Sequence, residues 1–214
     1  MYNLPEYKEK DHAVIRDFMK AHPFVLLAGA DANGIPVATQ VPLLIKERDG
    51  KLFFHGHIMK QTDHHKAFLQ NPHVLAVFMS PHTYVSASWY SNPQQGSTWN
   101  YMTVQAKGQL TFLEESSLPG ILRETTTLFE NNEHSPASFD QIPDEYVQRM
   151  VKAIVAFEIE VTALNHVFKL SQNRDEASYH NIIDRLQQGG GQAQYIAEQM
   201  KQRTSQLFKP GEAQ

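Results

Sequence analysis

The sequence predicts a mainly β protein with helices, of the α+β class, in which about six strands close into a small barrel. Short apolar runs are separated by tight turns, and helical patterns gather between the strands and toward the C-terminus. The sequence lacks the regular alternation of strand and helix that a parallel α/β sheet requires. With 214 residues, of which 41% are hydrophobic, the chain can bury the core of one full domain.

Turn signals separate the elements of the first half. Pro23 ends the first helix, because the residue before a proline avoids the helical region. Asn33-Gly34 predicts a tight turn between two strands. Pro36 and Pro42 lack the N–H that a central strand needs, so the strand that contains them should be an edge strand or carry a bulge. The expected elements are a helix over 9–21, strands over 24–30, 35–45 and 52–57, a helix over 62–71 and a strand over 74–79.

The second half begins with a long aromatic connection over 80–100. After it we expect a strand over 101–113, a helix over 118–130, a helix over 144–151 that leads into a strand over 156–163, and helices over 175–188 and 192–208. Residues 156–163 alternate cleanly between apolar and polar side chains, which is the period of a half-buried strand. Gly189-Gly190-Gly191 separates the last two helices and is interpreted as a flexible hinge.

Composition excludes several classes of protein. The chain has no cysteine, so disulfides, thiolate metal sites and cysteine nucleophiles are excluded. Its apolar runs are too short for a transmembrane helix, and its first residues lack a signal-peptide pattern, so we expect a cytoplasmic protein without membrane contact. The formal net charge of −4 argues against a nucleic-acid-binding surface. The basic residues of the tail, Arg185, Lys201, Arg203 and Lys209, are best explained as a solvated helix face.

Common catalytic motifs are also missing. We find no phosphate-binding glycine loop and no nucleophile elbow, and we assign no catalytic residue. His55 and His57 lie on one face of a strand, and His64-His65 follows closely, so these imidazoles could bind a metal ion or serve as haem ligands. Without a supporting carboxylate pattern, we interpret them as lining a ligand cleft or the surface, and we predict no metal site.

The aromatic connection is the most informative segment. Both tryptophans of the chain, Trp89 and Trp99, lie in it among tyrosines and hydroxyl residues. Flat aromatic surface with nearby hydrogen-bond donors suits a planar heteroaromatic ligand. The same composition is typical of dimer interfaces, so both interpretations stay open.

Four blocks of the sequence resemble the PaiB-like proteins, described as FMN-binding negative transcriptional regulators. The blocks are Ala38 to Leu43, Gly56-His57 with Lys66, Tyr84 to Tyr90 with Thr98-Trp99-Asn100-Tyr101, and Phe168 to Arg174. The resemblance implies an FMN-binding split β-barrel with C-terminal helices, as in pyridoxamine-phosphate oxidases and flavin reductases. It further implies a homodimer with FMN sites at the subunit interface.

The resemblance also implies roles for individual residues. Lys66 corresponds to the basic residue that meets the FMN phosphate, Thr39 to Pro42 run beside the ring, and Asn100 approaches from the partner subunit. The full set of implied cofactor-binding residues is Thr39, Gln40, Val41, Pro42, His55, His57, Lys66, Trp99, Asn100, Tyr101, Lys169, Gln172 and Asn173. Residues 1–174 are expected to form the barrel, and 175–214 a helical extension packed on the barrel or on the partner.

By resemblance, the function is repression of sporulation and degradative-enzyme genes. DNA contact follows from the resemblance alone, because the charge balance does not support it. A flavin-dependent oxidoreductase of the same fold group, or a haem-binding relative, is the alternative, so enzymatic turnover is left open.

Overall fold

The computed structural model describes residues 1–132 and 134–208, which form seven strands and seven α-helices. The strands are β1 (Phe24–Ala30), β2 (Pro36–Pro42), β3 (Leu44–Arg48), β4 (Lys51–Met59), β5 (His73–Val85), β6 (Thr98–Phe112) and β7 (Ile154–Lys169). The helices are α1 (His12–Ala21), α2 (Asp63–Gln70), α3 (Leu118–Glu130), α4 (Asp144–Ala153), α5 (Glu176–Gln187), α6 (Gly191–Lys201) and α7 (Thr204–Leu207). No helix within these described ranges is long and apolar enough to cross a membrane.

One curled sheet contains all seven strands, in the order β2-β1-β5-β6-β7-β4-β3. The pairs β1–β2, β1–β5, β3–β4 and β4–β7 are antiparallel. Strand β2, at one end of this order, also contacts β4 near the other end, so the sheet curls toward closure. This half-barrel with helices confirms the predicted mixed fold class.

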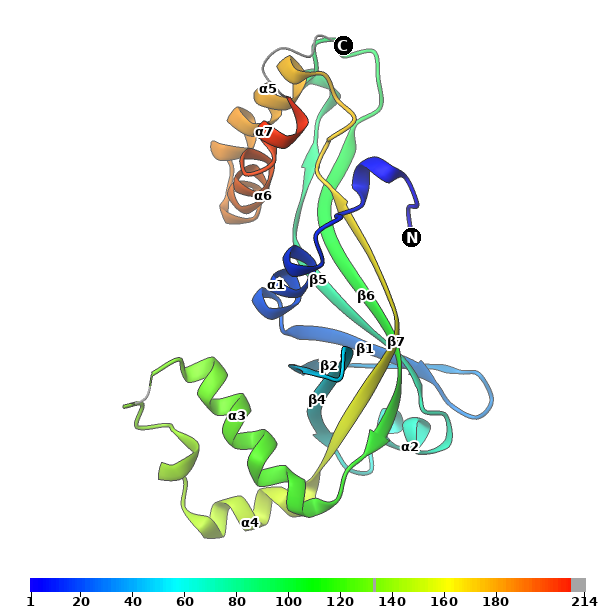
Figure 1. Cartoon of the computed structure of the whole chain (residues 1–214), viewed down its shortest axis with the longest axis vertical. Coiled ribbons are helices and arrows are strands. Elements are labelled where there is room, and N and C mark those ends of the chain that lie inside the picture. Colours follow the sequence, from blue (N-terminus) through cyan, green and yellow to red (C-terminus); the bar gives the residue numbers. More distant parts are fainter. Residues whose placement is uncertain (133, 209–214) are drawn as a thin grey trace. The chain divides into compact units, whose positions relative to one another are not determined.

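The chain divides into two compact units. Unit 1 comprises Met1–Ile15, Met79–Val104 and the described residues from His166 onward, whereas unit 2 comprises Arg16–Phe78 and Gln105–Asn165. The long strands β5, β6 and β7 run through both units (Figure 1). The domain boundary expected at residue 174 stays a prediction. The last residues of the expected helical extension, 209–214, lie outside the described part of the chain.

The predicted strand over 35–45 is wrong in one respect, because it is two strands rather than one. Strand β2 ends at Pro42 and β3 begins at Leu44, and these strands lie at opposite edges of the sheet. Between them Leu43 is buried, and its N–H donates to the carbonyl of Pro23 at 2.9 Å. Both prolines lie in the edge strand β2, which confirms the edge placement that their missing N–H predicts.

The predicted aromatic connection is too long at both ends. Strand β5 continues to Val85 and β6 begins at Thr98, so only 86–97 connect them. Polar side chains in 80–85 obscure a strand whose buried residues alternate with more exposed ones near its end. Strand β7 likewise extends to Lys169, beyond the predicted 163, and the last predicted helix is split into α6 and α7.

Each unit has its own core. In unit 2, α3 and α4 pack with the strands around a cluster of buried apolar residues: Leu44, Leu118, Ile121, Leu122, Val151, Ile154 and Ala156. In unit 1, α5 packs against α6, and the fully buried Tyr179 donates its hydroxyl to the carbonyl of Met200 at 2.9 Å. Figure 1 shows α5, α6 and α7 gathered together.

Candidate functional site

The unit 2 residues of the predicted site lie on β2 and on two elements that contact it, α2 and β4. Helix α2, which carries Lys66, packs against β1 and β2, and β2 contacts β4, which carries His55 and His57. The structure therefore brings these three predicted groups into one neighbourhood. The residues of β2 divide between two faces, since Val41 is buried and Thr39 half-buried, whereas Gln40 is exposed.

Strand β2 offers backbone groups as well as side chains. It is hydrogen-bonded to β1 along one side, with Thr39 opposite Leu27 and Val41 opposite Val25. As the first strand in the sheet order, it has no strand paired to its other side within the described residues. An edge strand presents unpaired N–H and C=O groups, which can bind the polar rim of a planar ligand.

The two histidines of β4 have different environments. His55 Nε2 lies 2.7 Å from Glu158 Oε2, which also accepts from Arg48 Nη2 at 2.9 Å. His57 is half-buried and has no hydrogen-bonding partner among the described residues. Burial lowers the pKa of His57 below its usual 6.5, so its imidazole is neutral at pH 7. His55 is thus held by protein groups, whereas His57 is free to contact a ligand.

Two lysines lie near the start of α2, namely Lys60, which is paired with Glu115 at 3.5 Å, and Lys66. Thr62 caps the helix by accepting from the backbone N–H of His65 at 3.3 Å. The pKa of His65 is lowered first by burial and then by the charges of His64, Lys60 and Lys66. Lys66 itself is exposed and has no carboxylate partner in the described part of the chain. Asp63 is the acidic residue in the first turn, and its hydrogen bonds with His64 lower its pKa. This end of α2 can therefore attract a phosphate dianion.

The unit 1 residues of the predicted site meet where β6 begins and β7 ends. Lys169 Nζ donates to the carbonyl of Trp99 at 3.2 Å and also contacts Thr98 Oγ1. Asn100 is fully buried, and its Oδ1 accepts from Ser171 Oγ at 3.0 Å while its Nδ2 lies 3.5 Å from Met200 Sδ. Asn100 thus fixes the turn that follows Lys169.

Gln172 stabilises the same turn from within. Its side-chain oxygen accepts from the N–H of Leu170 at 2.7 Å, and its amide donates to the carbonyl of Phe168. Asn173 is exposed in this turn, and Tyr101 is half-buried on β6. Asn100 and Gln172 therefore act structurally here, and their contact with a cofactor stays a prediction.

An aromatic surface lies beside these residues. Trp99 is 52% exposed and Tyr84 is 48% exposed, and their rings meet edge to face at 5.9 Å. The exposed His82 lies 5.7 Å from the same indole ring, between ring centres. We refer to His82, Tyr84 and Trp99 as the aromatic patch. Such a patch can stack on a flat ligand or be buried in an interface.

Two residues near this region were missed by the prediction of site residues. Arg174 lies with Cζ 4.1 Å over the ring of Tyr90, and both Arg174 Nε and the Tyr90 hydroxyl are buried without a hydrogen-bonding partner among the described residues. Both belong to sequence blocks that carry the family resemblance, and these blocks are the feature of the sequence from which the two residues could have been predicted. Within the described residues, no group of three or more His, Asp or Glu side chains is arranged to hold a metal ion.

Comparison with known proteins gives the family. The model of a family described as "Putative FMN-binding domain" matches residues 1–163. The chain belongs to this FMN-binding family. It is also 31% identical over 187 residues to Bacillus subtilis "Protease synthase and sporulation protein PAI 2", which covers 87% of this chain and 89% of that protein. The resemblance to PaiB-like proteins and the FMN cofactor are therefore confirmed.

Solved structures confirm the split-barrel fold of this FMN-binding protein. A conserved hypothetical protein from Mycobacterium tuberculosis superposes with a TM-score of 0.55 at 14% identity, over 78% of this chain and 90% of that chain. The FAD and haem binding protein from Mycobacterium smegmatis gives a TM-score of 0.54 at 14% identity, over 75% of this chain and 72% of that chain.

The residues of unit 2 fit FMN. The flavin phosphate needs a cation, which Lys66 of α2 supplies, and the polar edge of the flavin ring needs donors and acceptors, which the unpaired side of β2 supplies. The unpartnered imidazole of His57 is a third group available to a ligand. These observations are independent of the family match, and they agree with it.

Proposed function

We propose that this protein is an FMN-binding regulator that acts as a homodimer. The observation that carries the proposal is that the edge strand β2, helix α2 with its Lys66, and β4 with its His57 are linked by contacts within unit 2, and that these two side chains have no partner among the described residues. Lys66 would hold the phosphate, and Thr39 to Pro42 would lie along the ring. When bound, FMN supplies a redox-active and light-absorbing ring.

The aromatic patch supports the dimer. An indole that is half exposed beside a half-exposed tyrosine leaves apolar area in water, and a two-fold interface is the commonest way to cover such area. We propose that this patch is covered by the partner subunit, where Trp99 and Tyr101 would contact the cofactor. Asn100 would act as a positioning residue, because it holds the turn with Lys169, Gln172 and Asn173.

We further propose that the protein works as a negative transcriptional regulator of sporulation and degradative-enzyme genes, as the PaiB-like resemblance implies, and that it does so in the cytoplasm. Its tail offers little positive charge to DNA. Arg203 is largely buried, with Nη2 3.8 Å from a Glu9 carboxylate oxygen, and Lys209 lies outside the described residues. Regulation through the flavin, through a small molecule or through a protein partner is therefore favoured over tight operator binding.

Two measurements test this function. The purified protein should bind FMN stoichiometrically, as seen by quenching of flavin fluorescence during titration, and absence of binding would refute the proposal. Fluorescence anisotropy with promoter and scrambled duplexes should show weak binding that physiological salt abolishes. Nanomolar, sequence-selective binding at that salt would instead establish a direct repressor.

A flavin-dependent oxidoreductase is the second candidate, favoured by one observation. His57 is kept neutral by burial and lacks a partner among the described residues, so it could move a proton to or from a substrate at the flavin. The FMN-loaded protein would then oxidise NADH or NADPH with an acceptor present. His57→Asn should abolish that turnover while FMN remains bound.

A further inference from the structure

Unit 2 contains an open pocket of about 510 Å³ that the flavin residues do not line. It lies between the end of α1, the start of β3 and the second half of α3. Its apolar lining comes from Pro23, Leu43, Leu44, Ile45 and Leu128. Pockets of about 300–1,000 Å³ with apolar walls and a few polar groups are typical of small-molecule sites.

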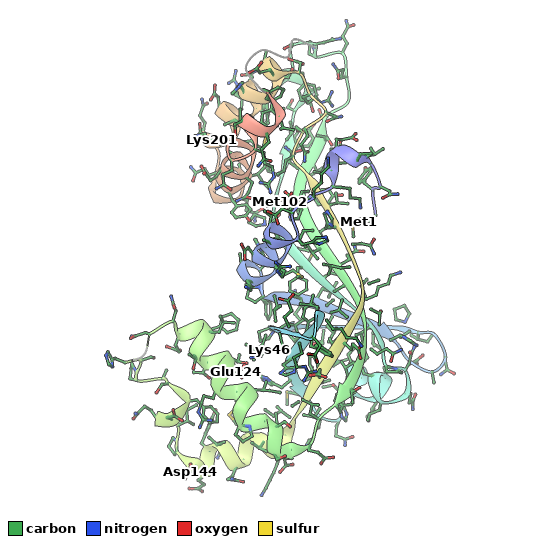
Figure 2. The ribbon with its side chains drawn as sticks, in the orientation of Figure 1. Met1, Lys46, Met102, Glu124, Asp144 and Lys201 are labelled. Carbon is green, nitrogen blue, oxygen red and sulfur yellow. The ribbon has the colours of Figure 1, made fainter. Side chains whose placement is uncertain are left out.

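Charged side chains complete the lining of this pocket, namely Lys20, Lys46, Arg123 and Glu124. Lys46 of β3 forms an ion pair with Glu124 of α3, and Figure 2 labels both residues. Arg123 donates to Asp140 Oδ1 from Nε at 3.0 Å and from Nη2 at 2.9 Å. Two of the three cations are therefore neutralised by carboxylates.

Lys20 is the cation that remains. It lies in the last turn of α1, it is exposed, and it has no carboxylate partner in the described part of the chain. An apolar pocket with one uncompensated positive charge is complementary to a ligand with an apolar body and a single negative charge. Leu128, which is 49% exposed, provides apolar surface that such a body would cover.

We propose that this pocket binds an aliphatic monocarboxylate, with the carboxylate at Lys20 and the hydrocarbon chain against Leu43, Leu44, Ile45 and Leu128. A dianion would need a second free cation, and a neutral ligand would leave Lys20 without a partner. A carboxylate near neutral pH carries the one charge that the pocket lacks. This site does not depend on FMN, because its residues are separate from those proposed for the flavin.

The test is calorimetric titration of the full-length protein with straight-chain carboxylates from hexanoate to decanoate, below their micelle concentrations. Each added methylene should tighten binding about fourfold until the pocket is filled. The alcohols of equal length should bind about tenfold more weakly, since they lack the charged hydrogen bond. Lys20→Met should remove this preference for the acid.

Controls separate the pocket from general effects. Lys152→Met removes one exposed lysine of the same unit and should leave the binding of acids unchanged. Leu128→Glu should weaken the binding of acids of every chain length. Because Leu128 is 49% exposed, the new carboxylate stays in water, and circular dichroism of the variant should match that of the unmodified protein. Absence of binding, no chain-length dependence, or equal acid affinity in Lys20→Met would overturn the proposal. It would also be overturned if Leu128→Glu converted a dimer to a monomer, because the pocket would then be an interface between copies.

Discussion

Replacement of Lys66 by Gln tests the flavin site most directly. Lys66 has no carboxylate to release before it binds, so its loss removes one charged hydrogen bond to the phosphate, worth about 1.5–3 kcal/mol. The side chain is exposed, and solvent screening places the effect at the lower end, about 1.5 kcal/mol. The dissociation constant for FMN should therefore rise about tenfold.

The assay is fluorescence titration of FMN and of riboflavin, which lacks the phosphate. Riboflavin affinity should not change in Lys66→Gln, and the salt dependence of FMN binding should become shallower. Lys107→Gln, which removes the same charge from an exposed position on β6, is the matched control. An equal loss of affinity for both ligands, or no loss for FMN, would show that Lys66 does not meet the phosphate.

Three further results are expected. Gly108→Ala should lower the free energy of unfolding by about 1–3 kcal/mol in urea titrations, because the added Cβ would lie 2.6 Å from the carbonyl oxygen of Glu160. Gly96→Ala is the control: its added Cβ would meet nothing within 4 Å, so the free energy of unfolding should change by less than about 0.5 kcal/mol. The protein should lose stability as pH falls through 6.5, because the unfolded chain protonates His57, His65 and His166 more readily than the folded protein does, and His57→Gln should make this dependence shallower. Light scattering at micromolar concentration should give twice 24.4 kDa, and Trp99→Ser should weaken the dimer at least tenfold; a monomer mass for the unmodified protein would contradict the dimer.

The accuracy of the predicted elements follows the strength of their end signals. Strand β1 was predicted with its observed bounds, because Pro23 and the Asn33-Gly34 turn delimit it. Helix α3 was also predicted with its observed bounds, and it ends where Asn131 adopts a left-handed conformation with φ of 45°. Local sequence is sufficient where the chain marks both ends of an element.

Long-range pairing explains the errors. Nothing local to Pro42 distinguishes a bulge within one strand from a crossing between two sheet edges, because the difference depends on where β4 lies. Likewise, 80–85 form a strand because β6 lies beside them in the sheet. The contact of the unit 2 residues with FMN stays a prediction that rests on their sequence blocks. The structural use of Asn100 was not predictable, since its partner Met200 is far away in sequence.

The single residue between β2 and β3 has a mechanical consequence. The N–H of Leu43 is hydrogen-bonded to the carbonyl of Pro23, and its side chain is buried, so the connection between the two strands cannot lengthen. An extra residue inserted in the Asp31 to Gly34 turn between β1 and β2 would extend into solvent. An extra residue inserted at position 43 would instead displace β2 and β3, the two edge strands of the sheet. Strand β2, beside the proposed flavin site, and strand β3, in the wall of the proposed carboxylate pocket, are thus directly connected, and a shift in one should displace the other.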